Sequence, residues 1–110
     1  MIKVTFDTFY SGKTTVLINK GRYTKNKTTA LMATCSDPEN YGEPWGTISV
    51  NLGIRLDDDE IFADINNNES LVAAMVKQKL LIPTGITQRS GFVEYPLMKL
   101  GKELQELTYF

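Results

Sequence analysis

Apolar side chains recur at every second position in several stretches of this chain, and this periodicity constrains the fold more than any other feature. Near the start, Ile2, Val4 and Phe6 alternate with polar residues, as expected of a β-strand with one buried face. The alternation is most regular over residues 47–52, where we expect another strand. Apolar or β-branched runs between turn residues predict further strands at 14–19, 28–35, 60–65 and 92–98.

One stretch has the periodicity of a helix. Asn66 can cap this helix, with Glu69 three residues later in a capping-box arrangement. The helix should end by about Leu81, because Pro83 disfavours helical geometry in the residue before it, and 83–85 is predicted to turn the chain. The residues of its apolar stripe, which we expect to pack on the sheet, are Leu71, Val72, Met75, Val76 and Lys79.

These elements predict an α+β fold, with an antiparallel sheet of four to six strands and one amphipathic helix packed on one face. Pro96 is predicted to place the last strand near an edge, because proline cannot donate a hydrogen bond to a neighbouring strand. No internal repeat or linker interrupts the sequence, so we expect residues 1–110 to form a single domain. With 42% apolar residues, the chain can build one core without a metal or a disulfide.

The cysteine content and the length of the apolar runs indicate the compartment. Cys35 is the only cysteine, so no disulfide can form within the chain. The first ten residues lack the charged flank and apolar core of a secretory signal, and no apolar run approaches the length of a membrane span. We therefore expect a cytoplasmic protein.

The sequence contains no histidine, which removes the catalytic arrangements that depend on one. Ser-His-Asp and Cys-His nucleophilic sites need a histidine, as do the usual histidine-containing zinc sites. Histidine is also the commonest general base near neutral pH. We therefore expect a protein that is not an enzyme and that binds no cofactor.

Two short motifs are similar to ligand-binding loops but lack the residues that those loops require. Gly12-Lys13-Thr14 matches the end of a phosphate-binding loop, yet Asp7 takes the place of the leading glycine and a strand-like sequence follows. Asp64 begins a run similar to a calcium loop, but the glycine and the glutamate needed at its sixth and twelfth positions are absent. We expect a β-turn at the first motif, helix capping at the second, and no metal site.

Charge is distributed unevenly along the chain. Residues 1–35 contain six basic residues and one acid, residues 36–70 contain nine acids and one arginine, and residues 71–110 contain five basic residues and three acids. Blocks of opposite sign either form separate surface patches or fold against each other and neutralise. The sequence leaves both outcomes open.

The acidic block holds the first candidate binding surface. Its most concentrated part is a run of four consecutive acids: Asp57, Asp58, Asp59 and Glu60. Such a run can steer a basic partner into contact, while Tyr41 and Trp45 in the preceding loop can supply the apolar contacts. A solvated acidic turn without a partner is the alternative.

A basic cluster that includes an aromatic residue is the second candidate surface. Its members are Lys20, Arg22, Tyr23, Lys25 and Lys27. Nucleic-acid-binding proteins use such cations for phosphates and such rings for stacking on bases. The net charge of −1 weighs against this function, and a solvated hairpin tip is the alternative.

Two stretches together resemble the sequence signature of a family of small uncharacterised proteins. Residues 41–52, YGEPWGTISVNL, are similar to the G-E-P-x-x-T-x-x-V-N-L centre of that family. Residues 82–85, IPTG, and 90–97, SGFVEYPL, are similar to its C-terminal x-P-T-G and S-G-F-V-x-x-P motifs, and residues 66–71 match its helix entry. The resemblance covers roughly residues 22–100 and carries over no catalytic residue.

Proteins of that family are found on plasmids and conjugative elements of gut and Gram-positive bacteria, in the company of anti-restriction and anti-CRISPR proteins. The resemblance implies a non-enzymatic binding protein of a mobile element that antagonises a host defence nuclease by occupying a protein surface with its acidic segment. The expected partner is then a larger nucleic-acid-handling protein. Direct nucleic-acid binding through the basic cluster is the alternative, and a structural or toxin–antitoxin-type interaction domain is a third.

Overall fold

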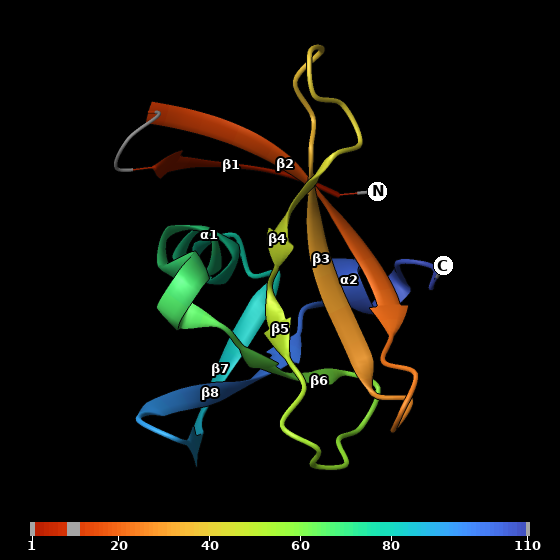
Figure 1. Cartoon of the computed structure of the whole chain (residues 1–110), viewed down its shortest axis with the longest axis vertical. Helices are drawn as coiled ribbons and strands as arrows, with labels where there is room; N and C mark the ends of the chain where they lie inside the picture. The colour runs from red at the N-terminus through yellow and green to blue at the C-terminus, as the bar shows by residue number, and fades with distance from the viewer. Residues whose placement is uncertain (1, 9–11, 110) are drawn as a thin grey trace.

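The computed structural model describes residues 2–8 and 12–109. Within these residues, eight strands and two helices follow one another, arranged as in Figure 1. Neighbouring strands pair antiparallel in two four-stranded sheets, in the orders β1-β2-β3-β4 and β5-β6-β8-β7. The predicted α+β class is confirmed, with the strands divided between two sheets. The bounds are β1 (Ile2–Thr8), β2 (Gly12–Arg22), β3 (Thr29–Cys35), β4 (Pro44–Thr47), β5 (Ser49–Val50), β6 (Glu60–Ala63), α1 (Ile65–Lys77), β7 (Leu81–Ser90), β8 (Val93–Leu100) and α2 (Lys102–Glu106).

The first sheet follows the periodicity of the sequence. Val4 and Phe6 in β1 are buried, and the residues beside them point to solvent. β1 and β2 pair without interruption from Ile2 opposite Ile18 to Thr8 opposite Gly12. The alternating pattern at the start of the chain therefore predicts β1 correctly, because one face of the strand covers the core.

The stretch 47–52, predicted as one strand, is divided between the two sheets. β4 ends at Thr47 and β5 begins at Ser49, so the chain passes from the first sheet to the second at Ile48. The Ile48 N–H donates to the carbonyl of Leu31 in the first sheet, and the Ile48 carbonyl accepts from the N–H of Asp64 beside the second. Alternation continues across the break because the buried Ile48 side chain lies in the core that both sheets share.

Helix α1 begins earlier than predicted, and a different residue caps it. Asp64, not Asn66, is the N-cap: its Oδ1 accepts from the backbone N–H of Asn67 at 3.3 Å. The Asn67 side-chain amide also donates to Asp64 Oδ2 at 2.9 Å, so both carboxylate oxygens of the N-cap residue accept hydrogen bonds from Asn67. The predicted stripe is confirmed at Leu71, Val72 and Met75, which are buried. It is wrong at Lys79, which is exposed because the helix ends at Lys77.

Asn68 interrupts the first turn of α1 and ties the helix to the first sheet. Its backbone is non-helical, with φ −130° and ψ 36°, and its side chain is buried. The Asn68 side-chain amide donates to the carbonyl of Thr47 at 2.9 Å. This bond satisfies a carbonyl at the end of β4, where the chain leaves the first sheet.

The turn predicted at 83–85 is instead an irregularity within β7. The register with β8 shifts between Pro83 and Thr87, and Gly85 has a φ of +83°. The Thr84 hydroxyl donates to the Leu97 carbonyl at 2.7 Å, so the side chain holds the two strands together where the backbone ladder is disturbed. The sequence signals for a turn were genuine, but they mark a bulge.

The prediction that Pro96 lies in an edge strand is wrong, but Pro96 does lie where one of the two strand pairings of β8 has ended. β8 lies between β6 and β7, so it is not an edge strand. The pairing with β6 covers only Leu97, Met98 and Lys99, so Pro96 lies just beyond the last residue of β8 that pairs with β6. Its missing N–H leaves no gap in that ladder, which is why a proline is tolerated in an inner strand.

A single cluster of buried side chains joins both sheets and both helices, from Val4 in β1 to Leu104 in α2. The short helix α2 completes this core at the C-terminal end of the described chain. None of the helices in the described residues is long and apolar enough to cross a membrane. The largest fully buried side chains include Ile18, Leu31, Ile61, Leu71 and Leu100.

Candidate functional site

The acidic block does not form one surface. Its first part is the acidic loop, residues 36–43, which joins β3 to β4 at the top of Figure 1 and contains Tyr41. Its second part is the acidic turn, residues 57–60, which lies beyond the connection from β5 at the bottom of the same view. The structure therefore does not bring Tyr41 to the acidic turn, as the sequence had suggested.

The acidic turn is partly neutralised by the basic cluster. Arg22 at the end of β2 donates from Nη1 to Asp58 Oδ1 at 2.8 Å and from Nη2 to Asp58 Oδ2 at 3.3 Å. These hydrogen bonds lower the pKa of the Asp58 carboxyl, and the positive charge of Arg22 lowers it further. Asp59 forms a looser pair with Lys99, at 3.9 Å. Here the two charge blocks fold against each other.

Lys20, predicted as a candidate phosphate contact, is buried and serves the fold. Its Nζ donates to the carbonyls of Leu104 and Gln105 in α2, at 2.8 and 3.0 Å, and lies 4.3 Å from the ring centre of Tyr109. Burial lowers the pKa of the Lys20 ammonium and the positive charge of Arg22 lowers it further, while Asp58 has the opposite effect. Because its hydrogen bonds point inward, Lys20 is not presented to a partner.

The aromatic member of the basic cluster is also used within the fold. The Tyr23 hydroxyl and the Ser49 hydroxyl form a 2.7 Å hydrogen bond, and Tyr23 is half-buried. Burial raises the pKa of the Tyr23 hydroxyl. Its ring is therefore poorly placed to stack on a base, and of the predicted nucleic-acid contacts only Lys25 and Lys27 are exposed without an ion pair among the described residues.

Tyr109, which the sequence did not single out, organises this end of the molecule. The Arg22 guanidinium lies 4.0 Å from the centre of its ring, and its hydroxyl forms a 2.9 Å hydrogen bond with the Thr29 hydroxyl. Thr29 also donates to the carbonyl of Asp58 at 2.8 Å. No local pattern marks Tyr109, because its partners come from strands about eighty residues earlier in the chain.

The acidic loop presents an aromatic ring among carboxylates. Tyr41 is 64% exposed, and its acidic neighbours Asp37, Glu39 and Glu43 are exposed as well. Backbone hydrogen bonds close the base of the loop, from Cys35 N–H to the Glu43 carbonyl at 2.8 Å and from Gly42 N–H to the Cys35 carbonyl at 2.9 Å. Within the loop, Asp37 Oδ1 accepts from the Asn40 N–H at 3.0 Å.

Trp45, the second predicted apolar contact, is mostly committed to packing. Its ring meets the ring of Phe6 edge-to-face, with centroids 5.3 Å apart and planes at 85°. Trp45 is half-buried and packs against the core, immediately after the acidic loop. Trp45 therefore supports the loop from below, and Tyr41 is the aromatic side chain that the loop offers to a partner.

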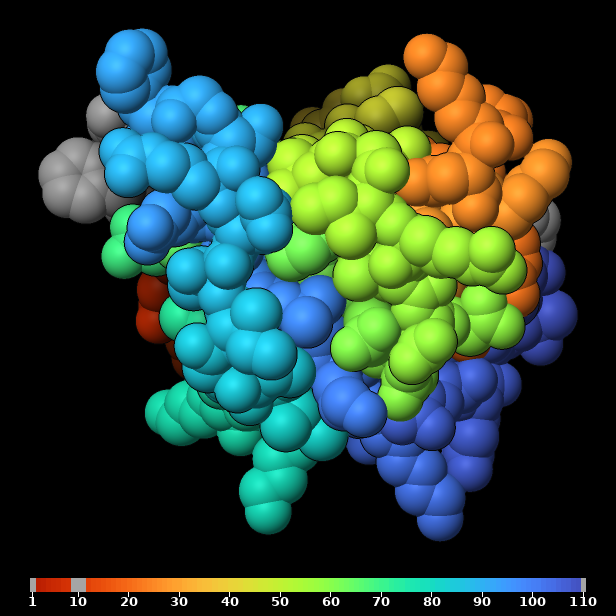
Figure 2. Space-filling view, turned by 90° about the horizontal axis from the view of Figure 1, so that it is seen from below, coloured from red at the N-terminus to blue at the C-terminus, as the bar shows by residue number. Residues whose placement is uncertain are grey.

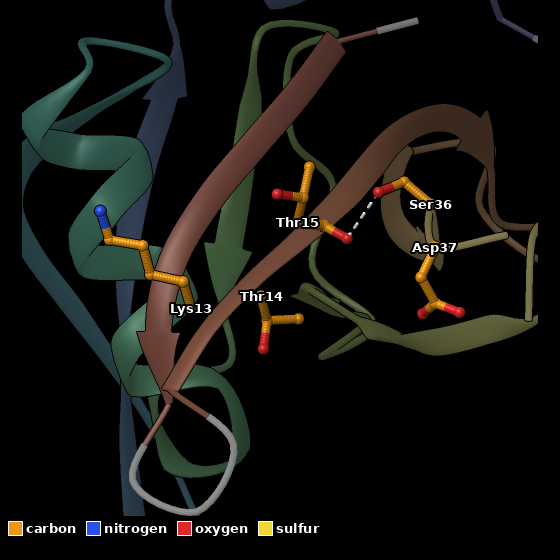
Figure 3. A pocket seen from close by; sticks show the side chains of 5 residues that line it. All are labelled: Lys13, Thr14, Thr15, Ser36 and Asp37. Carbon is orange, nitrogen blue, oxygen red and sulfur yellow. Dashed lines mark hydrogen bonds between the residues drawn. The ribbon is translucent and has the colours of Figure 1, made fainter. Parts of the chain in front are cut away.

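The motif Gly12-Lys13-Thr14 opens β2, so the predicted turn is wrong for these residues, and residues 9–11 lie outside the described part of the chain. A strand follows Thr14, as predicted, and Asp7 lies opposite Lys13 in the register. Figure 3 shows the Lys13 side chain directed away from Ser36 and Asp37, which line the other side of the adjacent hollow. This arrangement offers a phosphate no cradle.

Among the described residues, no three Cys, Asp or Glu side chains come together in a way that could hold a metal ion.

A model of a family described as a domain of unknown function, DUF4313, matches residues 17–108 of the chain. No curated protein and no solved structure matches it. The matched residues include both the acidic loop and the acidic turn.

Proposed function

The chain belongs to the DUF4313 family, and we propose that it is a non-enzymatic protein-binding domain that uses the acidic loop to capture a basic surface of a larger protein. The observation that carries this proposal is the 64% exposure of Tyr41 on a hydrogen-bonded loop that also presents three carboxylates. The acidic turn is a weaker candidate, because Arg22 already engages both oxygens of Asp58.

The chemistry of the loop suits recognition of a cationic protein surface. Exposed carboxylates raise the rate of encounter with a basic partner, and a tyrosine can supply the apolar contact that holds the complex together. The hydrogen bonds at Cys35 and Asn40 reduce the freedom that the loop would lose on binding, which lowers the entropic cost of association.

The partner that best fits is a nucleic-acid-handling protein in the bacterial cytoplasm, such as a defence nuclease. Such proteins carry basic grooves for phosphates, and carboxylates can occupy these grooves in place of the phosphates. The sequence resemblance to proteins of plasmids and conjugative elements supports the same role, in which the chain protects a mobile element as anti-CRISPR proteins do.

The test compares capture from a bacterial lysate before and after nuclease digestion, with the retained proteins identified by mass spectrometry. Wild type should retain the same basic protein after digestion, and Tyr41→Ala should weaken that capture by about thirtyfold, the equivalent of about 2 kcal/mol. Replacing the loop acids by Asp37→Asn, Glu39→Gln and Glu43→Gln should slow association, and Asp37→Asn keeps the acceptor for Asn40.

Lys25→Ser combined with Lys27→Ser is the matched control, because both side chains are exposed at the other end of the molecule. This control should retain the partner as wild type does. The proposal is wrong if all captured proteins disappear on nuclease digestion, or if the lysine variant loses the partner while Tyr41→Ala keeps it. Either result would favour the nucleic-acid alternative.

A further inference from the structure

A depression of about 520 Å³ lies at the end of the molecule opposite the acidic loop, between the β2–β3 turn and the segment that leads to the acidic turn. Figure 2 views the molecule from this end and shows the two segments, orange and yellow-green, side by side. Arg22 and Lys27 line the depression from one side, and Arg55 and Asp58 from the other. We propose that this depression binds the phosphate group of a small phosphate monoester.

The charges around the depression favour an anion. Arg55 is the one basic residue in the acidic block of the sequence, and the fold places it in the same depression as Arg22 and Lys27. Three cations therefore face one carboxylate, that of Asp58, and both oxygens of that carboxylate already accept from Arg22. Guanidinium groups bind phosphate oxygens through paired, charge-assisted hydrogen bonds, and Arg55 can offer such a pair. Arg22, whose Nη1 already donates to Asp58 and to the Lys27 carbonyl, contributes mainly its positive charge.

Arg22 and the two segments that border the depression are held in place by contacts within the chain. The Arg22 guanidinium lies 4.0 Å from the centre of the Tyr109 ring, and its Nη1 donates to the Lys27 carbonyl at 3.0 Å. The two segments are joined by the Asn26 side-chain amide, which donates to Asn51 Oδ1 at 2.9 Å. A site already shaped for its ligand loses less entropy on binding.

Gly53 completes the wall of the depression on the side of Arg55. Its φ of +75° is a conformation that residues with side chains rarely adopt, and its N–H donates to Asn51 Oδ1 at 3.1 Å. Asn51 therefore links the turn that contains Gly53 to Asn26 on the opposite segment. This short network holds the backbone of the two segments together.

The size of the depression and its aromatic surroundings favour a small ligand over a nucleic acid. A volume of about 520 Å³ is in the range of small-molecule sites. Single-stranded nucleic-acid sites add rings on which bases stack, whereas here Tyr23 is half-buried and bonded to Ser49, and Tyr109 is covered by Arg22. Phosphate recognition at this site therefore does not require a polynucleotide.

The test uses nuclear magnetic resonance titration of the whole chain with inorganic phosphate and with glycerol phosphate. Both ligands should move the amide signals of Lys27 and Gly53 in a saturable manner. Arg55→Gln should weaken binding by about tenfold, the loss expected for one charge-assisted contact, while Lys25→Gln should change it less than about twofold. Lys25 is exposed on the same turn but does not line the depression, so it controls for general surface charge.

Asp58→Asn gives the sharpest test, because removing a carboxylate has opposite effects on a site for an anion and on a site for a cation. If the depression binds phosphate, this variant should bind phosphate several-fold more tightly, since the competing carboxylate is gone. If the acidic turn instead binds a basic ligand, the variant should bind that ligand more weakly. We expect Arg22 to keep its contacts with Tyr109 and the Lys27 carbonyl in this variant, because neither involves the Asp58 side chain. Melting temperatures of both variants, measured in parallel, separate lost binding from lost folding.

A third ligand distinguishes the source of the phosphate. Oligothymidylate without a terminal phosphate offers only phosphodiesters, and it should shift these signals less than glycerol phosphate does at the same phosphate concentration. The proposal is overturned if neither phosphate nor glycerol phosphate shifts Lys27 and Gly53, if Arg55→Gln binds as wild type does, or if only the oligonucleotide binds. None of these outcomes depends on the acidic loop, so the two proposals are tested separately.

Discussion

The acidic loop and the acidic turn come from the same block of the sequence, yet they have different chemical roles. Among the described residues, the two ion pairs, Arg22–Asp58 and Lys99–Asp59, both involve the acidic turn. The loop carries its exposed acids on a backbone closed by its own hydrogen bonds. Local acidic composition therefore does not identify a free charged surface, because the decisive partner, Arg22, lies far away in the sequence.

The largest expected effect is a loss of stability on substitution in the core, which supports both the acidic loop and the acidic turn. Leu71 in α1 is fully buried in the cluster shared by the two sheets. Leu71→Ala should lower the free energy of unfolding by about 2–5 kcal/mol, because it removes buried methyl groups and leaves a cavity. Urea denaturation measures the loss. A melting temperature close to that of wild type would show that α1 contributes little to the support of either end.

The next largest effect is expected for Lys20→Met, which tests whether a buried lysine of the basic cluster stabilises the fold while an exposed one does not. Methionine keeps most of the apolar contact but removes the Lys20 donor from the carbonyls of Leu104 and Gln105, and among the described residues the Leu104 carbonyl then accepts only from the Leu107 N–H. We expect a loss of about 1–3 kcal/mol in unfolding free energy. Lys25→Met, on the exposed turn of the same cluster, should change it by less than about 0.5 kcal/mol. Equal losses would contradict the distinction.

The sequence predicted those elements whose residues contact near neighbours in the chain. The alternation in β1 and the stripe through Leu71 and Met75 follow from burial of one face, which acts on each segment locally. The cap was misplaced because Asp64 and Asn66 are both good N-caps, and the backbone bond from Asp64 to Ile48 joins residues too far apart in the sequence to be inferred from it.

The candidate site was predicted less well than the fold, for a physical reason. The charge blocks and the exposed Tyr41 are visible in the sequence, since they depend on composition and on position in a loop. The pairing of Arg22 with Asp58 joins residues 36 positions apart, and the contact with Tyr109 joins residues still more distant. Neither can be inferred from spacing, because two sheets must first form to bring them together.

The smallest expected effect concerns the ion pair that distinguishes the two acidic segments. Hydrogen bonding to Arg22 holds the pKa of the Asp58 carboxyl below its ordinary value of 3.8. The unfolded chain therefore binds this proton more readily than the folded chain. The stabilisation from Asp58 is fully present above that ordinary value and is lost as the pH falls through the lower value of the folded state.

Asp58→Asn should accordingly be slightly less stable than wild type near neutral pH, by less than Lys20→Met, because the pair is exposed to solvent. The difference between the two proteins should shrink as the pH falls below 3.8 and should also shrink at high salt, which screens the pair. Glu39→Gln on the acidic loop is the matched control and should leave the stability at neutral pH unchanged. Urea denaturation across this pH range makes the measurement. A gap that persists undiminished in acid would mean that Asp58 supports the fold through its shape or its backbone bonds rather than through its charge, and the contrast with the acidic loop would then not be electrostatic.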